Sequence, residues 1–314
     1  MRRCSGAHRP GSPGRWYSRP WSIAKKRDMR LITGLAVLVL LAAQVQAAAP
    51  AVVDTVQMPA WLDRGGETQP LTLGAEVKNG DRLRTGKAGR AYLKLVDGSM
   101  VKLGESATLA FYSLTLRPER RFKGALDVLG GAFRFTTDAV DRAGGNRQLD
   151  IRVGSATAGI RGTDLWGKSD AQRDLICLIE GHIELSHAGA TQDMTDPLSY
   201  FVAPKNAAAL PLARVEPEQL QRWARETEVL PGDGAARRGG KWKLLLGTVD
   251  EEKQALAIYD QARAAGYATQ IRPRGGGGKW TYQVLIAALA SAEEAAALAA
   301  RVRSDLGLVA GVTR

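Results

Sequence analysis

Glycine interrupts short runs of alternating apolar and polar residues from residue 52 to about residue 187, at intervals of roughly 8 to 12 residues. No long amphipathic helix fits this spacing. The Asn79-Gly80 and Asp97-Gly98 pairs favour tight turns, and the second predicts a two-residue type I′ hairpin between strands at 91–96 and 99–103. The pattern predicts an all-β domain over 52–187, of sandwich, barrel or solenoid type.

Residues 241–314 repeat one plan of strand, helix and strand. Thr248 with Glu251, and Ser291 with Glu294, have the capping-box spacing that begins a helix, and a glycine follows each helical stretch. Strands are predicted at 242–246, 269–272, 280–287 and 308–313. The order βαββαβ predicts a small α+β, ferredoxin-like domain with two helices on one side of a four-stranded sheet.

The segment between these parts, residues 188–240, contains five prolines and ends in a glycine-rich stretch. This composition predicts a mostly extended and flexible linker. Within it, residues 216–228 place apolar side chains at helical spacing after Pro217. We therefore expect one short helix, packed on the β domain.

The N-terminal region has the composition of an export signal. A basic stretch at 25–30 precedes an apolar run at 31–45, and Ala47 and Ala48 offer a small-residue cleavage site. Residues 29–47 are thus interpreted as a signal peptide, and residues 1–28 as an over-extended start or a disordered N-terminus. The hypothesis is a periplasmic protein, and the alternative is an uncleaved anchor in the inner membrane, although about 15 apolar residues are short for a span.

A net charge of +12 is typical of a protein that binds nucleic acid, but the charge is not evenly distributed along this chain. Residues 1–47 hold nine Lys and Arg against one Asp, so this segment supplies +8 and the remainder only +4. We therefore expect no nucleic-acid partner.

Few residues in this sequence could form a catalytic or metal site. Cys177 would be the sole cysteine after cleavage, which predicts a buried structural thiol rather than a disulfide. Cys177 and His182 differ by an odd number of positions, so on one strand they face opposite sides. Too few His and Cys residues are present for a typical zinc site, and Trp280 replaces the hydroxyl residue of a phosphate loop. We expect no enzyme activity, no metal and no cofactor.

Four stretches, at 74–86, 97–104, 158–166 and 178–185, are similar in this order to motifs of the FecR-like periplasmic domain family. The most specific reads Ala-Gly-Ile-Arg-Gly-Thr-Asp-Leu-Trp and contains Arg161, Gly162 and Thr163. The resemblance implies a β-solenoid-like module whose relatives receive signals from outer-membrane receptors and control a sigma factor. Residues 1–28 depart from those relatives, because they are too short and too rich in Pro and Gly for a sigma-binding helical domain. The Arg161-Gly162-Thr163 motif has two interpretations, a structural turn or an interaction site.

The C-terminal plan resembles the SPOR domain, a family that binds peptidoglycan glycan strands lacking stem peptides. Strand alternation with Leu244 and Leu246 facing the helices leaves an open sheet face as the candidate glycan site, formed by Lys243, Leu245, Thr281, Gln283 and Leu285. Leu245 stands where the family has a Gln, so this chain lacks that amide, and Gln283 is the residue expected to substitute for it. Trp280 is expected at the core or rim of the sheet.

Together these patterns predict a non-catalytic cell-envelope protein. Its SPOR-like domain would bind peptidoglycan glycan strands, and its FecR-like domain would be an interaction or sensory module for an envelope protein. The alternative is a FecR-type signalling regulator whose SPOR-like domain is a platform for binding proteins.

Overall fold

The computed structural model describes residues 50–116, 122–137, 147–276 and 279–314. The expected segments 1–28 and 29–47 and the cleavage site at Ala47 and Ala48 lie outside these residues. Among the described helices, none combines the length and the apolar character needed to cross a membrane.

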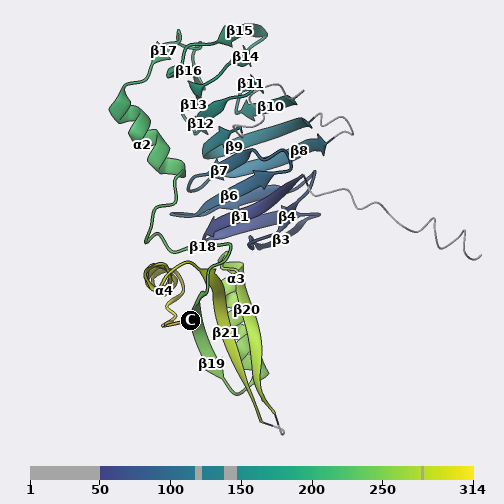
Figure 1. Cartoon of the computed structure of the whole chain (residues 1–314), viewed down its shortest axis with the longest axis vertical. Coiled ribbons are helices and arrows are strands. Elements are labelled where there is room, and N and C mark those ends of the chain that lie inside the picture. The colour runs from purple at the N-terminus through teal and green to yellow at the C-terminus, as the bar shows by residue number, and fades with distance from the viewer. Residues whose placement is uncertain (1–49, 117–121, 138–146, 277–278) are drawn as a thin grey trace, which may run out of the picture. The chain divides into compact units, whose positions relative to one another are not determined.

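Two β-sheets make up the β-rich half of the chain (Figure 1). The strands of the first sheet follow one another in the order β1 (Ala51–Gln57), β6 (Arg90–Leu95), β7 (Met100–Leu103), β9 (Phe122–Thr136), β12 (Asp164–Ser169), β13 (Arg173–Glu180), β16 (Ser199–Pro204) and β17 (Ala213–Arg214). The second sheet has the order β3 (Glu67–Pro70), β2 (Ala60–Arg64), β5 (Arg82–Thr85), β8 (Thr108–Leu116), β9, β10 (Arg147–Val153), β11 (Ala156–Ile160), β14 (Ile183–His187) and β15 (Ala190–Met194). The short strand β4 (Glu76–Val77) pairs with the start of β1.

Strand β9 belongs to both sheets. Its first half pairs with β8 and β10, and its second half pairs with β7 and β12. The change occurs at Gly131, which has a φ of +78°, and a Cβ there would lie 2.4 Å from the Cα of Ala107. Glycine is therefore required where the strand passes from one sheet to the other.

Alternating apolar residues from the two sheets form one core, as the sequence pattern predicts. Fully buried members include Val53, Leu93, Phe135, Ile151 and Leu185. The core thus confirms an all-β organisation for this part of the chain.

The hairpin between β6 and β7 is confirmed, but its turn differs from the predicted type. The N–H of Gly98 donates to Leu95 O at 3.0 Å, and the N–H of Leu95 donates to Ser99 O at 2.8 Å. Within this loop only Gly98 has a positive φ, at +86°. A type I′ turn needs positive φ at two residues, so this is instead a three-residue loop closed by a left-handed glycine.

The segment expected as a flexible linker is largely ordered. Strands β15, β16 and β17 lie after residue 187 and pair within the two sheets, so the sheets continue beyond the expected domain boundary. Helix α2 (Pro217–Thr227) begins with Pro217 in its first turn, as predicted. It packs on the β domain through Trp223, whose ring stacks on Trp166 at a centroid distance of 4.9 Å and an interplanar angle of 6°.

The C-terminal part has the predicted order of elements. It contains β19 (Trp242–Val249), α3 (Glu252–Ala264), β20 (Thr269–Gly276), β21 (Lys279–Leu289), α4 (Ala292–Leu306) and β22 (Gly311–Thr313). Its sheet has the order β22, β19, β21, β20. Helix α3 contributes buried alanines to the core, and α4 contributes Ala295, Leu298 and Val302. The predicted capping box of Thr248 and Glu251 does not form, because β19 continues through Val249 and α3 begins after Glu251 without a side-chain cap.

Strand β18 (Ala235–Arg237) joins the two parts of the chain. One of its edges pairs with β1, where Thr55 lies opposite Arg237, and Ala236 pairs with Leu289 of β21. The N–H of Ala60 also donates to Gly266 O at 3.1 Å. The expectation of a flexible connector is therefore wrong at its C-terminal end, since backbone hydrogen bonds hold it on both sides.

Candidate functional site

The C-terminal sheet has one face covered by helices and one open face. Leu244, Leu246, Val284 and Ile286 are buried in the core with α3 and α4. Side chains alternate along a strand, so their neighbours on β19 and β21 lie on the opposite face. The open face is therefore where this domain can meet a ligand.

Of the five residues predicted there, Lys243, Leu245, Thr281 and Gln283 are partly exposed. Leu285 differs, because only 2% of its surface is accessible. It lies on the central strand between Leu245 of β19 and Gln270 of β20. Leu285 therefore supports the floor of the face, and a ligand would contact its neighbours.

Strand β20 contributes residues to this face that the sequence analysis missed. Gln270 pairs with Leu285, Arg272 with Gln283, and Arg274 with Thr281. Gln270 and Arg274 are exposed, and Arg274 Nε donates to Gln283 Oε1 at 3.3 Å. The alternation of 270, 272 and 274 was available in the sequence, but its register against β21 was not.

A bulge in β19 adds one more polar residue. The register shifts between Leu245 and Gly247, and Thr248 then lies opposite Gln283. The open face thus combines amides, hydroxyls and guanidinium groups around a leucine pair, which suits hydrogen bonding to a polar polymer.

Trp280 lies at the start of β21 opposite Gly275, and half of its surface is exposed. It is therefore not part of the core, and the expectation of a rim position fits.

The Arg161-Gly162-Thr163 motif forms the turn between β11 and β12. Gly162 has a φ of +77°, and the Thr163 hydroxyl donates to His182 O at 2.9 Å. A Cβ on Gly181 would lie 2.4 Å from Gly162 O, so two turns touch here. This geometry supports the structural interpretation for Gly162 and Thr163, while Arg161 is exposed.

Asp164, the residue after this motif, leads to an ion-pair network on the first sheet. Arg134 makes two hydrogen bonds to the Asp164 carboxylate, at 2.9 and 2.7 Å, and also reaches Glu228 Oε1 at 3.3 Å. Because Glu228 follows α2 directly, the network connects the motif to the segment that leads to the C-terminal domain.

Glu228 is held by groups from β6 and β7 as well. Lys102 Nζ lies 2.6 Å from Glu228 Oε1, and the Tyr92 hydroxyl donates to Oε2 at 3.1 Å. Burial opposes ionisation of Glu228, but these hydrogen bonds and the charges of Lys102 and Arg134 outweigh it, so the pKa of the carboxyl lies below its ordinary value. Burial also raises the pKa of Tyr92 to about 12, which keeps its hydroxyl a donor.

Glu294 of α4 holds the other end of this segment. Glu294 is 4% exposed, and its carboxylate accepts hydrogen bonds from the N–H groups of Gly232, Gly234 and Ala235, at 3.1, 2.5 and 2.9 Å. We call residues 228–237 the strap. The predicted capping box is half formed, because Ser291 Oγ accepts from Glu294 N while the Glu294 side chain binds the strap.

Cys177 is fully buried in the first sheet. Burial, with a smaller effect of the Asp164 charge, raises the pKa of its thiol to about 12. A thiol that stays protonated is a poor nucleophile. The burial predicted for Cys177 is confirmed.

The chain thus consists of a two-sheet β domain that continues into a βαββαβ domain with an open polar face. Family models identify its parts: the FecR protein family matches residues 81–184, and the SPOR domain family matches residues 239–314. The chain therefore combines a FecR domain with a C-terminal SPOR domain, both of which are non-catalytic, envelope-associated domain families.

Two crystal structures of a protein from Parabacteroides distasonis, described as a candidate anti-sigma factor, are similar to this chain. Each has 12% sequence identity to this chain and a TM-score of 0.39. Both matches extend over 72% of this chain, and over 92% and 91% of the two crystallised chains respectively. No curated protein is significantly similar in sequence to the chain.

Proposed function

We propose that this is a periplasmic, non-catalytic envelope protein that binds stem-peptide-free peptidoglycan glycan through the open face of its SPOR domain. The observation that carries the proposal is the cross-strand arrangement on that face. Gln270 and Gln283 supply amides on neighbouring strands, and the partly exposed Leu245 supplies apolar surface on the same face. Sugar rings need both hydrogen-bonding groups and an apolar surface.

The arginines of β20 support the proposal that the face binds stripped strands. Removing a stem peptide from a glycan strand frees the carboxylate to which the peptide was attached. Arg272 and Arg274 are the cationic side chains on β20 at this face, and a guanidinium binds a carboxylate well. An intact strand lacks this charge and carries a bulky peptide instead.

The FecR domain is proposed as an interaction or sensory module. The strap is bound to the β domain through Glu228 and to the SPOR domain through Glu294. These contacts support a defined attachment of the two domains rather than a loose tether. A SPOR domain bound to the wall would thus present the FecR domain to its partner in the envelope.

Co-sedimentation of the full chain with sacculi tests glycan binding. We expect enrichment on amidase-treated sacculi over intact sacculi, and weaker enrichment for Gln283→Ala and Arg272→Gln. Lys253→Gln, an exposed change on α3, is the control and should bind like the wild type. Leu245→Gln should bind more strongly, because it adds an amide beside Leu285.

A signalling regulator with a protein-binding SPOR domain is the second candidate. The network from Asp164 through Arg134 to Glu228 favours it, since it connects the FecR motif to the strap. Equal sedimentation with both kinds of sacculi, unchanged by Gln283→Ala, would reject the glycan proposal and leave this one.

A further inference from the structure

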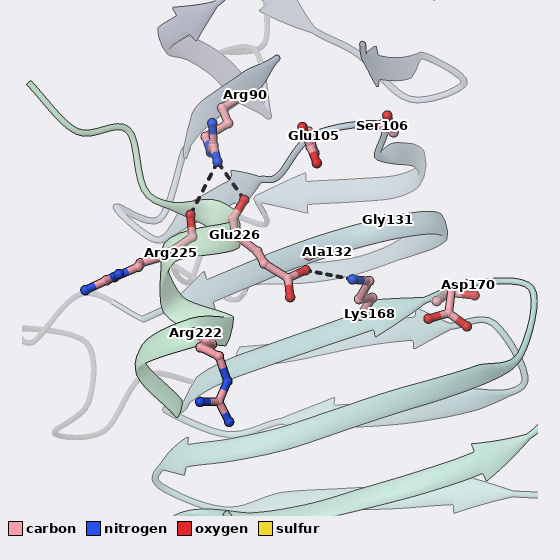
Figure 2. Close-up of a pocket in the computed structure, with 11 residues that line it drawn as sticks. Arg90, Glu105, Ser106, Gly131, Ala132, Lys168, Asp170, Arg222, Arg225 and Glu226 are labelled. Carbon is pink, nitrogen blue, oxygen red and sulfur yellow. Dashed lines mark hydrogen bonds and ion pairs between the residues drawn. The ribbon is translucent and has the colours of Figure 1, made fainter. Parts of the chain in front are cut away.

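A polar cleft lies on the FecR half, away from the SPOR domain's open face. It is a cavity of about 700 Å³ between α2 and the turns that follow β7 and β12 (Figure 2). That volume is in the range of pockets that hold small molecules or a few peptide residues. Its lining is mostly charged, which separates it from the apolar core.

The wall of the cleft that α2 forms is fixed by contacts of the C-terminal part of this helix with the sheet. Arg90 donates to the carbonyl oxygens of Glu226 and Arg225 at 3.3 and 3.4 Å, and Lys168 Nζ lies 2.8 Å from Glu226 Oε2. A Cβ on Gly104 would lie 2.6 Å from Glu226 O, so helix and sheet touch closely. The cleft is therefore preformed and does not depend on a ligand to open it.

Charges of opposite sign lie on its two sides. Figure 2 shows Glu105 and Asp170 on the side of the turns, and Arg222 on the side of α2. Within the described part of the chain none of these three side chains forms an ion pair. Glu105 accepts from Ala88 N, Asp170 accepts from two backbone N–H groups, and Arg222 donates to Gln219. Each keeps its charge available to a ligand.

We propose that this cleft binds an extended peptide segment of a partner protein that carries one basic and one acidic side chain. The basic group would meet Glu105 and Asp170, and the acidic group would meet Arg222. A ligand of one sign would pair with one wall and be repelled by the other, and a neutral one would leave all three charges unpaired. This inference is independent of glycan binding by the SPOR domain.

Three labelled hexapeptides test the proposal by fluorescence anisotropy with the full-length chain at low salt. One carries Lys and Glu three positions apart, one has the order reversed, and one has Gln at both positions. We expect saturable binding of at least one charged peptide, weakened by added salt, and none of the Gln peptide.

The variants keep the fold while removing charge. Glu105→Gln and Asp170→Asn retain acceptors for their backbone N–H partners, and Arg222→Gln removes the cation of α2. Each should weaken binding about five- to tenfold. Lys253→Gln is the control, because it removes one exposed cation on α3 and Lys253 does not line the cleft. Absence of saturable binding, or equal loss with Lys253→Gln, would overturn the proposal.

Discussion

The carboxylate of Glu294 accepts a hydrogen bond from the backbone N–H of Gly234 at 2.5 Å, across 60 positions of sequence. With Gly232 and Ala235 it holds three backbone N–H groups of the strap, beside the pairing of β18 with β1 and β21. Gly234 has a φ of +73°, and a Cβ added at this position would lie 2.9 Å from Leu298 N, so the chain passes close to α4. One side chain of α4 thus holds the end of the strap that lies against the C-terminal domain.

Replacing Glu294 by Gln should destabilise the strap. An amide lacks the negative charge and one acceptor, so at least one buried N–H loses its partner, at a cost of about 1 to 3 kcal/mol in the free energy of unfolding. Urea unfolding measures this cost, and hydrogen exchange should show faster exchange at Gly234 and Ala235. Glu293→Gln, an exposed neighbour, is the control and should change stability by less than about 0.5 kcal/mol. Equal effects of the two variants would contradict the role of Glu294.

Glu228 should make the free energy of unfolding depend on pH in the acidic range. Its pKa in the folded protein lies below the ordinary 4.5, so its charge contributes stability above the unfolded-state pKa, and that stability is lost as the pH falls through the folded-state pKa. In Glu228→Gln the free energy of unfolding should fall less steeply between about pH 5 and pH 3. Chemical unfolding across this range measures the slope, with Glu184→Gln as an exposed control. An unchanged slope in Glu228→Gln would show that the Lys102 and Arg134 contacts add no net stability.

The stacking of Trp223 on Trp166 should contribute much of the free energy that holds α2 on the β domain. Trp223 is 8% exposed, and Trp223→Ala removes its stacking and its contact with Tyr200. We expect a loss of about 3 kcal/mol in the free energy of unfolding and a weaker near-ultraviolet circular dichroism signal. Trp280→Ala, at a half-exposed site, should cost far less. A small effect of Trp223→Ala would mean that α2 is held mainly by its ion pairs.

Cys177 should resist thiol reagents in the folded protein. In a Cys4→Ser background it is the single cysteine, and a pKa of about 12 leaves only about one thiol in ten thousand ionised at pH 8. Native protein should therefore fail to react with a disulfide reagent over hours, and should react fully in guanidinium. Ser113→Cys, at an exposed position of β8, provides the positive control. Rapid labelling of native Cys177 would contradict its burial.

Local pattern predicted the elements well where one face of a strand or helix is buried. The alternation around Leu93 and Leu244 and the position of Pro217 led to the correct element types. It failed where tertiary contacts decide the outcome. Thr248 continues a strand instead of capping α3, and Glu294 binds distant glycines instead of its own helix end.

The candidate site was predicted only in part for the same reason. Alternation places Gln283 on the open face, but the neighbours Gln270 and Arg272 depend on the register between β20 and β21. Burial of Leu285 likewise depends on its position on the central strand. The linker was expected to be flexible because composition does not show that β18 has two pairing partners.

Nuclear magnetic resonance titration of the full chain with a stem-peptide-free glycan oligomer tests the central claim most directly. We expect chemical-shift changes in the amides of Lys243, Leu245, Gln270, Thr281 and Gln283, and none in the FecR cleft around Asp170. Shift changes confined to other surfaces, or no changes at saturating glycan, would contradict wall binding through this face.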